Sequence, residues 1–192
     1  MAGVPAWYPD PDEAKPAPMP LLLVQAFLNT RDPDSQIDLL SDADAAKQWL
    51  VGAGLLSADA PLRPADLVQA RASRDSIRTL LATDSGEARQ EPRLRPLQEL
   101  TETHQPRLGI DEHGALALKN AKHDDVGDGL FDLLLIIRAA QEGGSWTRLR
   151  ACANPDCGWV FYDRSRNQQG SWCAMAVCGN RLKNRRLRAR RR

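Results

Sequence analysis

The sequence predicts a mostly helical α+β body followed by a small C-terminal module built around cysteines. Apolar segments of helix length that end at glycine or proline recur along the chain, and one segment alternates instead. All four cysteines of the 192-residue chain lie between positions 152 and 178. We therefore expect a body over residues 19–145 and a module over residues 146–192. Six of the thirteen prolines fall in the first twenty residues, so residues 1–18 are predicted to be an unstructured lead.

Two helices are predicted at the start of the body. The run at 21–30 is short and continuously apolar, and we favour a helix over a strand. Ser41 followed by Asp44 is typical of a capping box, because the two side chains can bond the first free backbone N–H groups of a helix. Gly52 and Gly54 then close this second helix.

The rest of the body is predicted to hold three helices and a hairpin. Pro64 suits the first turn of a long helix that stops at residues 84–86, and a short helix follows over 94–100. Residues 107–119 alternate around a turn and predict a β-hairpin. Residues 128–142 predict a buried helix, since they are apolar on most sides. The apolar positions expected near one face of the long helix are Leu67, Ala70, Ile77, Leu80 and Leu81.

Charge is distributed unevenly along the chain, although its formal net charge is only +1. Residues 146–192 hold twelve Lys/Arg and two acids, and residues 1–145 hold the other 14 Lys/Arg and 23 acids. The module therefore carries +10 and the rest −9. An acidic body with a basic end is typical of a soluble domain joined to a polyanion-binding segment. We also consider that the body holds the basic end back until a signal releases it.

The sequence gives no sign of a membrane-spanning or secretory segment. Its longest apolar runs, residues 21–28 and 130–137, fall well short of the roughly 20 residues that cross a bilayer. The first residues have no basic region ahead of an apolar core, and they include Asp10, Asp12 and Glu13. We therefore expect a cytoplasmic protein, in which clustered thiols serve more often as metal ligands than in disulfides.

The four cysteines form two close pairs, Cys152 with Cys157 and Cys173 with Cys178, with fifteen residues between the pairs. Two turns that face each other can present four sulfurs to one tetrahedral ion, which is the arrangement of a structural zinc site. Residues 158–162 between the pairs predict a strand, so the layout is typical of a treble-clef or ribbon-like finger. Two disulfides and an iron–sulfur cluster are the alternatives.

Residues 148–188 resemble the CGNR-type zinc finger, named for the tetrapeptide at 178–181. Besides the paired cysteines, the shared residues are Trp159, Phe161, Asp163, Ser165, Arg166, Asn167 and Trp172. The resemblance implies one structural Zn²⁺. It also implies a preceding ABATE-type helical domain, in a family of bacterial proteins described as stress-induced transcriptional regulators.

The body is similar to that domain over a shorter stretch, residues 23–30. Phe27, Asn29 and Thr30 match the opening of the domain, but Ala26 stands where the family usually has Asp. In the finger, Gly170 and Ser171 precede Trp172 where relatives often have Arg. We expect fewer phosphate contacts from this loop.

The arginine-rich segment after Cys178 is predicted to form a basic helix. Arg181, Arg185, Arg188 and Arg192 fall on one stripe of such a helix. Guanidinium forks pair with phosphates, whereas an Asn or Arg near the helix start can contact base edges. The predicted nucleic-acid-binding residues are Asn180, Arg181, Lys183, Arg185, Arg186, Arg188 and Arg192, with Arg164 and Arg166 from the finger.

These patterns favour a DNA-binding transcriptional regulator over an enzyme. The sequence offers no recognisable nucleophile or glycine-rich phosphate loop, and His123-Asp124-Asp125 is interpreted as a polar loop before the buried helix. Double-stranded DNA is the predicted partner, which would make the protein nucleoid-associated when bound. A homodimer and a small-molecule or protein ligand of the body are further partners that we consider. The alternative is an RNA- or protein-binding adaptor whose zinc is purely architectural.

Overall fold

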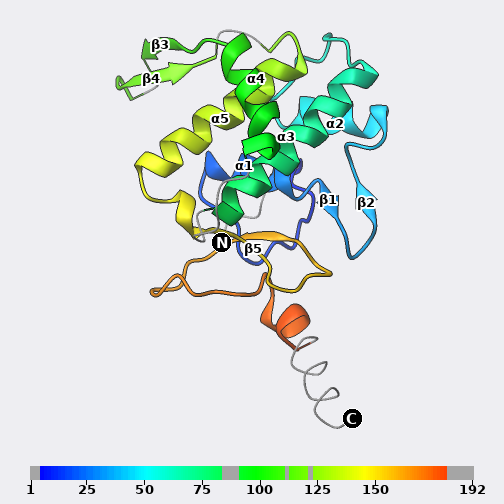
Figure 1. Ribbon diagram of the computed structural model, residues 1–192, viewed down its shortest axis with the longest axis vertical. Coiled ribbons are helices and arrows are strands. Elements are labelled where there is room, and N and C mark those ends of the chain that lie inside the picture. Colours follow the sequence, from blue (N-terminus) through cyan, green and yellow to red (C-terminus); the bar gives the residue numbers. More distant parts are fainter. Residues whose placement is uncertain (1–4, 84–90, 111–112, 121–122, 181–192) are drawn as a thin grey trace.

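The computed structural model describes residues 5–83, 91–110, 113–120 and 123–180 (Figure 1). The body holds the helices α1 (Leu21–Leu28), α2 (Ala43–Gly52), α3 (Pro64–Thr83), η1 (Glu91–Leu94), α4 (Arg95–Thr103) and α5 (Val126–Glu142). Its antiparallel hairpins are β1 (Arg31–Asp32) with β2 (Ile37–Asp38), and β3 (Arg107–Ile110) with β4 (Leu116–Lys119). The module holds η2 (Trp146–Arg148), the antiparallel strands β5 (Leu149–Ala151) and β6 (Val160–Tyr162), and the π-helical turn η3 (Met175–Gly179). The predicted fold class is confirmed.

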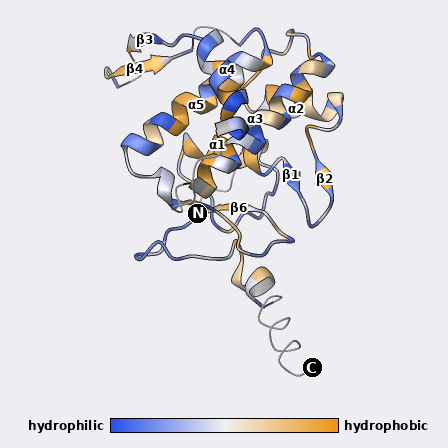
Figure 2. Cartoon of the chain, viewed as in Figure 1, coloured by the Kyte–Doolittle hydropathy of each residue, from blue (hydrophilic) through white to orange (hydrophobic). Residues whose placement is uncertain are grey.

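Helix α1 lies at the centre of the core, which explains its unbroken apolar sequence. Val24, Ala26, Phe27 and Leu28 are fully buried. The helix packs against α3 and α5 on the body side and against β6 of the module. Hydrophobic residues are accordingly concentrated on α1 and α5 (Figure 2). A helix enclosed on most sides needs no polar stripe.

The start of α2 differs by one residue from the predicted capping box. The cap is Asp42, whose side chain accepts a hydrogen bond from the backbone N–H of Ala45 at 2.9 Å. The hydroxyl of Ser41 instead donates to the carbonyl of Asp38 at 2.6 Å. Ser41 is therefore occupied by the preceding hairpin, and the neighbouring carboxylate takes over the capping role.

Helices α3 and α5 confirm their predictions, and four of the five apolar positions expected near one face of α3 are buried, Leu80 being half-buried. Helix α5 begins two residues earlier than expected because Asp125 caps it, accepting from the N–H of Asp128. A Cβ on Gly129 would lie 2.0 Å from the carbonyl oxygen of Leu55. Only glycine lets α5 pass this close to the loop after α2.

The β3–β4 hairpin has the predicted strands, but its apolar face is turned outward. Leu108 pairs with Leu118 and Ile110 with Leu116, so all four side chains lie on one face. Leu116 is 72% exposed and the other three are also exposed. The alternation of apolar residues therefore predicted the two strands correctly, but it did not predict that their apolar face is exposed.

The lead packs against the folded protein, so its predicted disorder is wrong for residues 5–18. Tyr8 is buried, and its hydroxyl accepts a hydrogen bond from the Asn29 side chain at 3.1 Å. The indole N–H of Trp49 donates to the carbonyl of Trp7 at 2.8 Å. The aromatic side chains supply apolar area for docking that a count of prolines does not reveal.

The module shares the core of the body. Trp146, Leu149, Val160 and Tyr162 are buried in the same apolar cluster as α1 and α5. Figure 1 shows β5 lying across the end of the body, next to α1. Within the described ranges, no helix combines the length and the apolar character needed to cross a membrane.

Candidate zinc centre and its attachment to the body

The four predicted cysteine ligands converge. Their sulfurs all lie within 4.8 Å of one another. Cys173 Sγ is 3.7 Å from Cys157 Sγ and 3.6 Å from Cys178 Sγ. A tetrahedral ZnS₄ centre with bonds of about 2.3 Å has sulfur–sulfur edges of about 3.8 Å. A disulfide requires about 2.05 Å, and none of the four cysteines is in one.

Local backbone turns aim these sulfurs at one point. Asn154 makes the first turn, because its carbonyl accepts from the N–H of Cys157 at 3.0 Å. Its side-chain amide lies 3.8 Å from the sulfur of Cys178, where it can donate to a thiolate. Gly158 follows with a φ of +62°, a conformation that favours glycine. Asn154 is itself buried, so the predicted turn residue also serves the second cysteine pair.

The thiols affect one another's protonation. A hydrogen bond with Cys173 lowers the pKa of Cys157 to about 6, and the same contact raises the pKa of Cys173. Burial raises the pKa of Cys178 to about 11. One thiolate therefore forms easily, whereas the remaining protons leave when a cation compensates the charge. A divalent ion supplies that compensation, and four thiolates around it leave a net charge of −2.

Asp163 closes the loop between the two cysteine pairs. Its carboxylate accepts from the N–H of Ser165 at 2.9 Å and from the N–H of Gly170 at 2.6 Å. Burial alone raises the pKa of Asp163, but the hydrogen bonds from Ser165 and Gly170 outweigh it and bring the pKa below its ordinary value. A Cβ on Gly170 would lie 2.8 Å from the carboxyl carbon of Asp163. The glycine that departs from the family pattern thus lets the loop close tightly here.

Two arginines near the zinc centre hold this loop instead of contacting the sulfurs. Arg148 donates to the carbonyls of Asp163 and Ser165, at 3.0 and 3.2 Å. Arg150 donates to the carbonyl of Gln168 at 2.7 Å. Their role is structural, and no pattern in the sequence indicates these long-range pairings.

The body holds the module through a buried amide. Asn29 accepts from the N–H of Val160 and donates to its carbonyl, both at 2.8 Å. Gln25 donates to the same carbonyl at 3.1 Å. Arg78 bridges the two parts, donating to the carbonyls of Gly158 and Leu28 at 2.7 and 2.6 Å. Asn29 was noticed in the sequence only as part of the family opening, and its contact with β6 explains its place there.

The lead also contacts the module directly. The carbonyl of Lys15 accepts from the N–H of Tyr162 at 2.9 Å, and the Lys15 ammonium lies over the ring of Phe161. The same ammonium donates to the carbonyl of Trp172 at 2.5 Å. The indole N–H of Trp159 donates to the carboxylate of Glu13 at 2.7 Å. Body, lead and zinc module therefore form one packed unit.

The predicted nucleic-acid-binding residues are described only in part. Asn180 is exposed directly after η3, and Arg164 and Arg166 are exposed on the Asp163 loop. Arg164 also donates to the carbonyl of Pro16 at 2.8 Å. Lys183, Arg181, Arg185, Arg186, Arg188 and Arg192, together with the predicted basic helix, lie outside the described residues.

The polar residues before α5 occupy a separate region. His123 pairs closely with Asp132 of α5. Donor atoms of His104, Asp125 and Asp128 gather nearby, but the carboxylate of Asp125 caps the helix and that of Asp128 accepts from the N–H of Asp124. These contacts account for both carboxylates as parts of the helix start.

Four cysteine sulfurs at tetrahedral spacing define a protein with one structural zinc ion. Family models match the chain in two places: "CGNR zinc finger" over residues 148–191 and "Putative stress-induced transcription regulator" over residues 22–142. The chain belongs to this regulator family, and its zinc module is a CGNR zinc finger. No curated protein matches the chain.

Proposed function

We propose that the protein is a DNA-binding transcriptional regulator that presents an arginine-rich segment from a rigid zinc module. The observation that carries the proposal is the position of the zinc centre. Cys178 is buried in it, and Asn180, two residues later, is exposed where the basic segment begins. Eight of the twelve residues 181–192 are Lys or Arg. Zinc fixes the start of this segment, so less conformational freedom is lost when it binds a polyanion.

The body supports the proposed function by holding the module in place. The module is attached through Asn29, Arg78 and Lys15. These contacts fix the orientation of its exposed loop, and of Asn180, relative to the body. Arg164 and Arg166, exposed on that loop, add positive charge to the module. We propose that phosphate contacts come from these arginines and the basic segment, and base contacts from Asn180 and Arg181. The proposed role of the protein is binding and not catalysis, and its proposed location is the cytosol.

The proposal is tested by fluorescence anisotropy of a labelled duplex with the zinc-loaded, full-length protein over a range of salt concentrations. Affinity should fall steeply as salt rises, because each phosphate contact releases condensed counterions. Replacing Arg185 and Arg186 with Gln should flatten the slope by about one to two, whereas the control Arg63→Ala, at an exposed position just before α3, should leave it unchanged.

The same assay with a matched RNA duplex separates the regulator from an adaptor. A regulator should prefer DNA and lose affinity when the zinc is removed by a chelator. Equal affinity for RNA, or no binding to either duplex, would contradict the proposal and favour an RNA- or protein-binding adaptor.

A further inference from the structure

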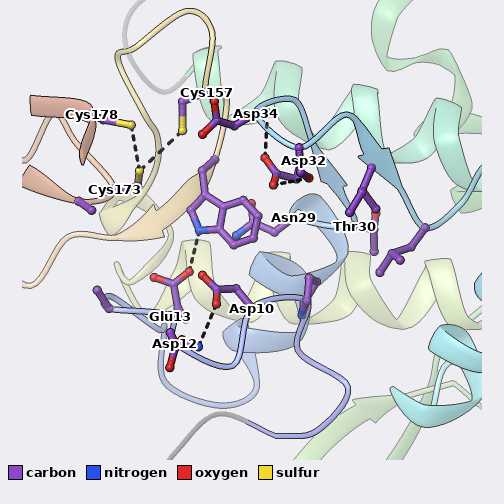
Figure 3. A pocket seen from close by; sticks show the side chains of 17 residues that line it. Asp10, Asp12, Glu13, Asn29, Thr30, Asp32, Asp34, Cys157, Cys173 and Cys178 are labelled. Atoms are coloured by element: carbon purple, nitrogen blue, oxygen red, sulfur yellow. Dashed lines mark hydrogen bonds between the residues drawn. The ribbon is translucent and has the colours of Figure 1, made fainter. Parts of the chain in front are cut away.

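A cavity of about 520 Å³ opens between the lead, the β1–β2 hairpin and the zinc centre (Figure 3). The lead contributes Asp10, Asp12 and Glu13, and the hairpin contributes Asp32 and Asp34. Figure 3 shows these two groups on different sides of the cavity, with the sulfurs of Cys157, Cys173 and Cys178 along another. Segments far apart in the sequence thus build one open cavity.

The cavity is strongly negative. Five carboxylates line it, and no Lys or Arg does among the described residues. The cation of the lead, Lys15, is directed to the carbonyl of Trp172 and the ring of Phe161. The zinc centre beside the cavity adds a charge of −2. Burial, with the neighbouring charges of Glu13 and Asp10, raises the pKa of Tyr8 far above its ordinary value, in line with this negative field.

An aromatic ring and apolar side chains line the cavity together with the carboxylates. Trp159 lines it, and a hydrogen bond from its indole N–H to Glu13 holds the ring in place. Ile37 and Leu39 of the hairpin line it as well. The face of an indole attracts a cation, and apolar walls favour a cation that carries a short hydrocarbon part.

We propose that this cavity binds one organic cation, a guanidinium or alkylammonium group with a short aliphatic chain. The cation is held by the carboxylates of the lead and the hairpin and stacks on Trp159. Two sources have this chemistry: a free small molecule, and an arginine of the protein's own basic segment, which begins three residues after Cys178 in the cavity wall. The free volume is more than such a group requires.

Occupancy of this cavity has a consequence for regulation, which rests on the proposed DNA-binding function. The cavity is lined by Asn29, which holds β6, and by three zinc ligands. A cation bound there draws the lead, the hairpin and the module together. If the cation is an arginine of the basic segment, that arginine is withdrawn from DNA, and a free cation of the same chemistry releases it.

The proposal is tested by isothermal titration calorimetry of the zinc-loaded, full-length protein with n-butylguanidinium. The matched neutral probe is n-butylurea, which has nearly the same shape without the charge. We expect one n-butylguanidinium per chain and at least about tenfold weaker binding of n-butylurea, because several partly exposed carboxylates contribute together. Equal affinity for the two probes, or no binding of n-butylguanidinium by either this protein or the arginine variant described below, would overturn the proposal.

Variants locate the bound cation. Asp12→Asn combined with Asp32→Asn should weaken n-butylguanidinium at least about threefold while the protein keeps one zinc per chain. The control, Asp44→Asn combined with Asp59→Asn, removes the same two charges from exposed sites that do not line this cavity. An equal loss in the control would show that the effect is general electrostatics and would overturn the assignment.

The two sources are separated by a variant with Arg185, Arg186 and Arg188 replaced by Gln. Tighter binding of n-butylguanidinium by this variant would identify the basic segment as the resident occupant, and unchanged binding would identify a free cation. If neither this variant nor the unaltered protein binds the probe, the cavity is not a cation site. Because the titration contains no DNA, its failure leaves the proposed DNA-binding function standing.

Discussion

Asn29→Ala should loosen the attachment between the body and the zinc module. Asn29 is 1% exposed and makes three hydrogen bonds, two with the backbone of Val160 and one with Tyr8. At about 1 kcal/mol each, their loss costs about 3 kcal/mol. The carbonyl of Val160 keeps its bond from Gln25, but its buried N–H is left without a partner, which adds about 1–2 kcal/mol.

We therefore expect Asn29→Ala to lower the free energy of unfolding by about 4 kcal/mol. For a chain of this length the midpoint of thermal unfolding then falls by about 10 °C. Urea unfolding of the zinc-loaded protein, followed by circular dichroism, measures the free energy. The matched control is Asn167→Ala, an exposed asparagine of the module loop, which should change it by less than about 0.5 kcal/mol. A loss below about 1 kcal/mol for Asn29→Ala would refute the reasoning.

The remaining predictions concern the zinc centre and its loop. Cys157→Ala should reduce bound zinc from one per chain to nearly none, measured with a chromogenic chelator; full retention would contradict the ligand assignment. Gly170→Ala should cost about 2 kcal/mol because its Cβ meets the Asp163 carboxylate, whereas Gly52→Ala, with 3.6 Å to its nearest contact, should cost far less; equal costs would argue against the crowding. Because the folded pKa of Asp163 is lowered, its contribution to stability is complete above about pH 4 and is lost as pH falls through the folded pKa. Urea unfolding at pH 5 and pH 3 should therefore show a smaller drop for Asp163→Asn than for the unaltered chain, and an equal drop would exclude this carboxylate as a source of acid sensitivity.

The sequence predicted those features that depend on neighbours along the chain. The spacing of Cys152, Cys157, Cys173 and Cys178 was enough to predict one tetrahedral centre, because two short turns can carry the sulfurs. The long helices α3 and α5 were predictable from apolar periodicity and end signals. The first residue of α2 was not, because Ser41 bonds to the preceding hairpin in preference to the helix.

Features that depend on distant contacts could not be predicted in this way. Nothing near Asn29 in the sequence indicates that its partner is Val160, 131 residues away. Prolines in the lead suggested disorder, yet a segment of turns with Trp7 and Tyr8 can dock without forming a helix. The cation cavity combines the lead, a hairpin that the sequence did not reveal and the module, so it exists only in the folded chain.

Selection from a random pool of duplex DNA by the zinc-loaded, full-length protein at near-physiological salt tests the central claim most directly. If the rigid zinc module reads DNA through Asn180 and Arg181, one sequence motif should be enriched, and Asn180→Ala or Arg181→Ala should reduce the discrimination. A paired motif would indicate that two copies of the chain bind together. Binding without enrichment of any motif would contradict a sequence-reading regulator and leave a clamp that recognises only phosphates.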